Sequence, residues 1–119
     1  MRDFRELKVW EKAHALTLKL YTLTRTFPRD EQYGLTAQIR RAAASVGANI
    51  AEGSGRRTRR DFARFLQVAL GSASELQYHL VLAVDLELLS RSDHAQLDGA
   101  TGEVKRMLTG FIRKLMADG

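Results

Sequence analysis

The sequence predicts an all-α protein folded as an antiparallel up-down four-helix bundle. Apolar residues recur at intervals of three and four in four separate segments, which is the pattern of one buried helix face. The chain has a single proline among 119 residues, and runs of β-branched residues are few, so strands have little support. Helices joined by short polar links pack antiparallel. With 45% hydrophobic residues, we expect 1–119 to form one domain.

The first two helices are expected at about residues 7–27 and 35–53. The apolar face of the first consists of Trp10, Ala13, Leu16, Leu20, Leu23 and Phe27. Pro28 cannot continue a helix, and polar residues 29–34 form the link. The apolar face of the second consists of Leu35, Ile39, Ala42, Val46 and Ile50. Gly53 and Gly55 follow, and we expect them to end this helix in the left-handed conformation that glycine permits.

The third and fourth helices are expected at about residues 59–89 and 93–117. Thr58 and Asp61 have the spacing of a capping pair at a helix start, and Ser90 or Ser92 is expected to cap the last helix. From Leu80 to Leu89 the sequence LVLAVDLELL is apolar on nearly every side. A bundle buries one face of each helix, so this surplus predicts a homo-oligomer built partly on this segment.

Positive charge is concentrated around the second link of the chain. Residues 40–64 hold seven arginines against Glu52 and Asp61, a balance of +5 that equals the formal net charge of the whole chain. Such a one-signed cluster at a turn favours a polyanionic ligand. Guanidinium groups suit phosphate geometry, and the candidate nucleic-acid-binding residues are Arg40, Arg56, Arg57, Arg59, Arg60 and Arg64. No aromatic residue interleaves the basic turn, so base stacking has little support there.

A line of polar residues runs beside the apolar face of the second and third helices. Its members are Gln38, Arg41, Ser45, Asn49 and Glu52 on the second helix and Ser72 and Glu75 on the third. Partly buried polar groups are usually satisfied by one another, so we interpret the line as a structural network that fixes helix register or a subunit interface. Antiparallel packing also predicts an ion pair between Arg41 and Glu75.

The sequence offers little support for an enzyme. The chain has no cysteine, and its three histidines fall on three different predicted helices without the spacing of a metal site. The Gly53–Gly55 turn lacks the lysine of a P-loop, and Ser45 and Ser72 have no evident general base. We therefore expect no catalytic residue, no metal and no cofactor. No window approaches the roughly 20 apolar residues needed to span a bilayer, and the charged N-terminus differs from a signal peptide, which favours a cytoplasmic protein without membrane contact.

Three motifs, taken together in this order, resemble the family of 23S rRNA-intervening sequence proteins. They are FRELKVWEKA, FPRDEQYGLTAQIRRAAASVGANIAEG and FLQVALGSASELQ, and the closest likeness spans about residues 4–89. The resemblance implies a small all-helical protein without a known reaction that assembles as a ring-like homopentamer. It also implies a relation to accessory proteins of diversity-generating retroelements, whose basic pentamers bind nucleic acid and a reverse transcriptase.

Residues and resemblance together favour a non-enzymatic protein that binds nucleic acid, with RNA as the main candidate, through the basic turn of a homopentamer. The alternative is an oligomeric scaffold whose basic turn docks an acidic partner protein. The two hypotheses share the same electrostatics, and a titration against RNA and DNA separates them.

Overall fold

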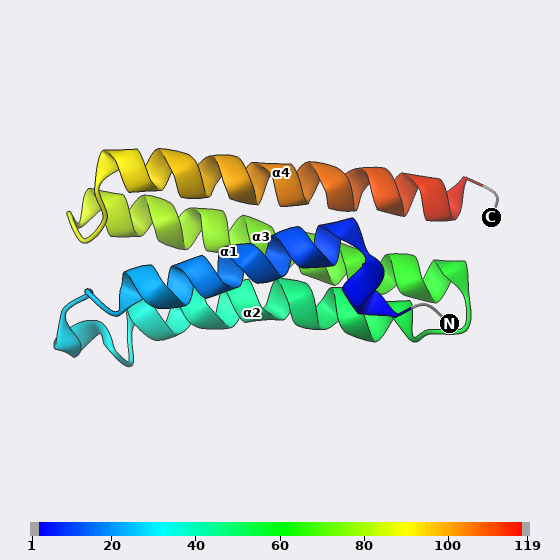
Figure 1. Cartoon of the computed structure of the whole chain (residues 1–119), viewed down its shortest axis with the longest axis horizontal. Coiled ribbons are helices and arrows are strands. Elements are labelled where there is room, and N and C mark those ends of the chain that lie inside the picture. Colours follow the sequence, from blue (N-terminus) through cyan, green and yellow to red (C-terminus); the bar gives the residue numbers. More distant parts are fainter. Residues whose placement is uncertain (1–2, 118–119) are drawn as a thin grey trace.

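The computed structural model describes residues 3–117, and this part of the chain is all α-helical, without strands. Four long helices run alternately up and down along a rod of 47 × 22 × 19 Å (Figure 1). They are α1 (Lys8–Thr24), α2 (Leu35–Ser54), α3 (Arg59–Asp85) and α4 (Arg91–Met116). Two short 3-10 turns, η1 (Phe4–Glu6) and η2 (Arg29–Glu31), precede α1 and α2. Within the described residues no helix has the length and apolar character that crossing a bilayer requires.

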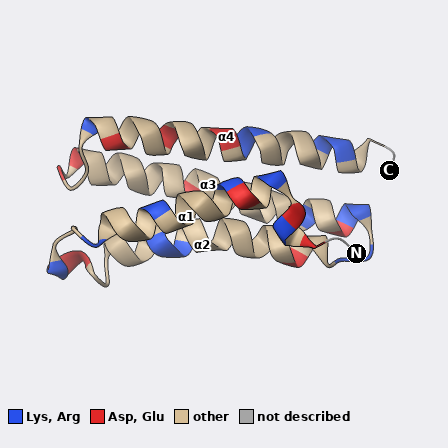
Figure 2. Ribbon diagram, in the orientation of Figure 1, with Lys and Arg blue, Asp and Glu red and all other residues tan. Residues whose placement is uncertain are grey.

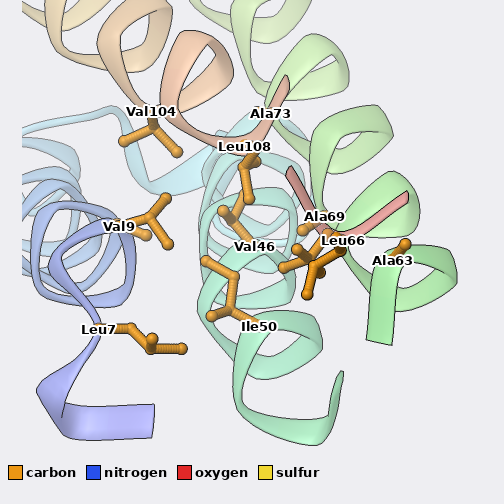
Figure 3. Packing of buried hydrophobic residues seen from close by; sticks show 12 residues of the cluster. Leu7, Val9, Val46, Ile50, Ala63, Leu66, Ala69, Ala73, Val104 and Leu108 are labelled. Atoms are coloured by element: carbon orange, nitrogen blue, oxygen red, sulfur yellow. The ribbon is translucent and has the colours of Figure 1, made fainter. Parts of the chain in front are cut away.

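The core fills the space between the four helices along the whole rod. Each helix packs against its two neighbours in the order α1, α2, α3, α4 and back to α1. One cluster of buried side chains centres on Ile50, Leu66 and Leu108, and Figure 3 shows members from all four helices pointing toward one another. A second cluster, around Ile39, Leu76 and Leu97, fills the other half. The buried residues of α3 include Ala63, Ala69, Ala73 and Ala83, whose small side chains allow neighbouring helices to approach closely.

The first helix ends one turn earlier than the sequence pattern predicts, at Thr24 and not near Phe27. The backbone N–H groups of Arg25, Thr26 and Phe27 bond three residues back, so the chain leaves α1 through a tight turn. The cause is Pro28, which disfavours helical geometry at the residue before it. Phe27 still packs against the core, which explains why its spacing fits the helix pattern.

The third helix ends at Asp85, and the apolar segment Leu80–Leu89 does not form one continuous helix. Leu88 N donates to Ala83 O and Glu87 N donates to Val84 O, with Glu87 at a φ of 62°, which is a Schellman motif. This turn sends Leu88 and Leu89 back onto the core. The predicted apolar surplus is therefore largely buried within the chain, and Val81 and Leu86 are the large apolar side chains of the segment that stay exposed.

Side-chain caps begin α3 and α4 where the sequence predicts them. Thr58 Oγ1 accepts from Asp61 N at 3.0 Å, and Ser90 Oγ accepts from Asp93 N at 3.0 Å. Each cap satisfies an N–H group that has no partner within the helix. The predicted starts of α3 at 59 and of α4 at 93 are therefore close to the observed ones at Arg59 and Arg91.

The two glycines at the end of α2 do not adopt the predicted left-handed conformation. Gly55 has φ −90° and ψ 0°, and no described glycine has a positive φ. Gly53 lies within α2 and is buried. A methyl group there would lie 2.8 Å from Phe65 Cβ and 2.9 Å from Phe62 Cδ1. The glycine is needed because α3 begins in direct contact with the backbone of α2.

We expect Gly53→Ala to lower the free energy of unfolding by about 1–3 kcal/mol, since the added methyl group overpacks a filled contact. Gly47→Ala is the matched control, because its nearest neighbour, Trp10 Nε1, lies at an ordinary 3.5 Å. The control should be neutral or more stable by up to about 1 kcal/mol through helix propensity. Urea unfolding followed by circular dichroism measures both; equal stability of the two variants would contradict the close contact.

Candidate nucleic-acid interface

One end of the bundle is strongly basic. The start of α1, the end of α2, the start of α3 and the end of α4 meet there (Figure 1). We call this the basic end; its cations are Arg5, Lys8, Arg56, Arg57, Arg59, Arg60, Arg64, Arg113 and Lys114. Four carboxylates lie among them, those of Asp3, Glu6, Glu52 and Asp61. The opposite end has the reverse balance, with Arg25, Arg29 and Arg91 against Asp30, Glu31, Asp85, Glu87 and Asp93 (Figure 2).

Two arginines of the basic end are held in place around the ring of Phe65. The guanidinium carbons of Arg56 and Arg64 lie 4.5 and 4.6 Å from the centroid of this ring. Asp61 also contacts both, at 2.9 Å to Arg64 Nη2 and 3.9 Å to Arg56 Nε. These exposed contacts add little stability, but they orient the two guanidinium groups before any ligand arrives.

Arg57, in the α2–α3 turn, and Arg60, in the first turn of α3, are two cations without an ion-pair partner among residues 3–117. Both are exposed, and neither makes a hydrogen bond or ion pair with another residue of the described chain. The arginines beside them in sequence are engaged: Arg56 lies against the ring of Phe65, and Arg59 donates to carbonyl groups at the end of α4. They are the side chains most available to an anionic ligand.

Arg59 has a structural position instead. Its Nε donates to Leu115 O at 3.1 Å and its Nη2 donates to Lys114 O at 3.2 Å, so the guanidinium caps the C-terminal carbonyls of α4. A cation at a helix C-terminus also opposes the helix dipole. Arg59 therefore ties the start of α3 to the end of α4 and sets the shape of the basic end.

Arg40 does not belong to the basic end, although its place in the sequence predicts a position with the arginines of the turn. Arg40 lies 14 residues before the end of α2 at Ser54, a rise of about 21 Å along the helix. Its Nε donates to Thr24 Oγ1 at 2.9 Å, its Nη2 donates to Tyr21 O at 3.2 Å, and its guanidinium stacks on the Tyr21 ring. Arg40 thus holds α2 against the end of α1.

Lys8, Arg113 and Lys114 lie at the basic end, although they are not among the nucleic-acid-binding residues predicted from the sequence. They come from the start of α1 and the end of α4, far from the turn in sequence. The predicted up-down order of the helices implies this placement, because it puts the start of α1 and the end of α4 beside the α2–α3 turn.

The line of polar residues predicted beside the apolar faces of α2 and α3 forms several separate contacts and not one continuous network. Ser45 Oγ and Ser72 Oγ share a hydrogen bond of 2.8 Å across α2 and α3, and Asn49 Nδ2 donates to Ser45 O at 2.8 Å. These three residues form the expected network between helices. The other members make contacts near to them in sequence: Gln38 pairs with Arg41 on α2, Glu75 pairs with His79 on α3, and Glu52 accepts from Arg56 in the α2–α3 turn.

The predicted ion pair between Arg41 and Glu75 is not formed. Arg41 Nη1 donates to Gln38 Oε1 at 3.4 Å, and Glu75 Oε2 contacts His79 Nε2 at 3.1 Å. Each side chain finds a partner one turn away on its own helix, which costs less ordering than a contact between helices. Among residues 3–117 no group of three or more His, Cys, Asp and Glu side chains is placed to hold a metal ion.

Comparisons with known proteins agree with this fold. The sequence model of a family described as 23S rRNA-intervening sequence protein matches residues 5–110. A crystal structure of a protein with unknown function, from the S23 ribosomal protein family of Bacteroides thetaiotaomicron, is 29% identical in sequence and superimposes with a TM-score of 0.81. The match covers 88% of this chain and 98% of that one. No curated protein matches the chain.

Proposed function

The chain belongs to the family of 23S rRNA-intervening sequence proteins, and from this membership and its basic end we propose that it is a non-enzymatic protein that binds RNA. The observation that carries the proposal is the opposite charge of the two ends of the rod (Figure 2). A phosphate backbone is attracted to one end and repelled from the other, so binding has a defined orientation.

The side chains of the basic end suit phosphate groups in two ways. Arg57 and Arg60 bring exposed guanidinium groups that pair with no carboxylate of residues 3–117, and such groups bind phosphate through two parallel hydrogen bonds. Arg56 and Arg64 are already oriented by Phe65 and Asp61, which reduces the entropy lost when a ligand binds. The Ser45–Ser72 bond supports a non-enzymatic protein, because it leaves both hydroxyls paired with each other and not with a general base.

The proposal includes a homopentamer acting in the cytoplasm. The outer face of α3 carries exposed apolar side chains from Val68, Tyr78 and Val81, a surface that a soluble protein usually covers by association. Gly71 lies among them in mid-helix with no atom near its position, which leaves room for a neighbouring backbone. Repeating the basic end in each subunit would multiply the attraction for a polyanion.

The test is a titration of the purified protein against structured RNA, duplex DNA and single strands at two salt concentrations. If Arg57, Arg60 and Lys114 each contact one phosphate, the logarithm of the affinity should fall with the logarithm of salt by about 2–3 per bound protomer. Absence of binding to every nucleic acid at low salt would overturn the proposal. Binding of an acidic protein under the same conditions would then favour a docking scaffold.

A further inference from the structure

The basic end contains a hollow whose floor is apolar and whose rim is cationic. It has a volume of about 690 Å³ and lies between the starts of α1 and α3 and the end of α4. Phe62, Met107 and Phe111 form part of the floor. Five cations belong to the lining, Lys8, Arg56, Arg57, Arg59 and Lys114, and none of the described residues that line the hollow is acidic. Its size falls in the range of pockets for small ligands.

Two aromatic rings line the hollow together with the cations. Phe62 and Phe111 meet edge to face, with ring centroids 5.1 Å apart and planes inclined by 71°. Both are partly buried, so each keeps some surface open. The sequence places no aromatic residue within the basic turn, but the fold brings Phe111 of α4 against Phe62 of α3. The fold thereby supplies a stacking surface that the sequence of the basic turn lacks.

We infer that this hollow receives one unpaired base of a single-stranded nucleic acid, while the adjoining phosphates rest on its rim. The inference depends on the proposed function and makes it more specific, because it selects unpaired strands over duplexes. A nucleotide combines a flat apolar body with an anion one sugar away, which matches an apolar floor bordered by cations. A base in a duplex is stacked and paired and cannot enter.

The positions of the rim cations support a strand that passes over the hollow. Arg57 comes from the α2–α3 turn, Lys8 from the start of α1 and Lys114 from the end of α4, so positive charge borders the floor on more than one side. Arg59 fixes the α4 side of the hollow through its bonds to Leu115 O and Lys114 O. A strand can therefore keep successive phosphates on cations while the base between them turns inward.

Gly110→Leu tests the inference without changing charge. Gly110 lines the hollow, is exposed, and has no atom within 4 Å of the position of an added side chain, so leucine should fill open space without disturbing the core. Gly99→Leu is the matched control. Gly99 is also exposed with open space beside it, and it lies on the same face of α4 about 16 Å toward the other end. Size-exclusion chromatography checks that both variants keep the native oligomer.

The probes are three fluorescent oligonucleotides of equal phosphate number: a single-stranded RNA, an RNA duplex and a strand made entirely of abasic sites. We expect the native protein and Gly99→Leu to bind the intact single strand about tenfold or more tightly than the abasic strand, as stacking of one base allows. Gly110→Leu should lower the affinity for the intact strand to that for the abasic strand and leave duplex binding unchanged.

Three results would overturn the inference, and they can be told apart. Equal affinity of the native protein for the intact and abasic strands, with no effect of Gly110→Leu, would mean that the basic end binds phosphates alone and that the proposed function stands without a base pocket. Absence of binding to all three probes at low salt would remove the proposed function as well. Release of bound RNA by an acidic, phenylalanine-containing peptide in the native protein but not in Gly110→Leu would assign the hollow to a protein segment instead.

Discussion

Replacement of Arg57 and Arg60 by glutamate is expected to weaken RNA binding by about 100-fold at physiological salt. The change removes two unpaired cations from the α2–α3 turn and places two anions where phosphates approach. Both arginines are exposed, and neither makes a hydrogen bond or ion pair with another residue of the described chain, so helicity and oligomer size should stay as in the native protein. Fluorescence anisotropy with labelled RNA measures the affinity, and circular dichroism measures the helicity.

The control for this variant carries the same change of net charge at the opposite end of the rod. Arg25 and Arg91 are exposed and lie beyond the end of α1 and at the start of α4. Their joint replacement by glutamate should reduce the affinity only slightly, because these charges lie more than a Debye length from a ligand at the basic end. Equal losses in the two variants would indicate attraction by net charge alone and would contradict a localised site.

Leu66→Ala is expected to lower the free energy of unfolding by about 2–5 kcal/mol, the largest stability effect among these predictions. The Leu66 side chain has an exposed fraction of 0% and packs within the cluster at the basic half of the core (Figure 3). Truncation leaves a cavity that the surrounding helices fill only in part. Because this cluster supports the starts of α1 and α3, RNA affinity should fall as well once a substantial fraction of the protein is unfolded.

Leu18→Ala provides the comparison, since Leu18 has an exposed fraction of 56% on α1. Its truncation removes the same atoms from a site that borders water and should cost less than about 1 kcal/mol. Denaturation in urea, fitted with a common slope, compares the two variants. A similar loss of stability in both would mean that Leu66 is not at the centre of the core or that Leu18 is covered in the oligomer.

The sequence was sufficient for the number, order and starting points of the helices. Apolar spacing marks the buried faces, and Thr58 and Ser90 mark starts because a hydroxyl cap acts within three residues of itself. Helix ends were predicted less well. The Schellman turn at Glu87 contains no glycine, the residue that usually marks such a turn in a sequence. Leu88 and Leu89, which follow the turn, continue the apolar pattern although they pack on the core from outside the helix.

The candidate site was predicted only where it is local in sequence. Arg57 and Arg60 lie close to the turn where the sequence concentrates positive charge. Arg40 is near them in sequence, but it lies about 21 Å along α2 from the end of that helix. Arg59 belongs to the arginine cluster in sequence, but its guanidinium group caps the end of α4. The sequence around Arg59 does not indicate this role, because the role depends on where another helix ends. The contact between the rings of Phe62 and Phe111 likewise forms only when α3 packs against α4, so no pattern along the chain predicts it.

The most direct test of the central claim, that RNA binds at the basic end, is photocrosslinking of the native protein to RNA containing 4-thiouridine, followed by mass spectrometry of the linked peptides. We expect crosslinks in peptides covering residues 54–64 and in those covering residues 107–116. Crosslinks concentrated in residues 25–34 or 85–94, at the acidic end of the rod, would contradict the account.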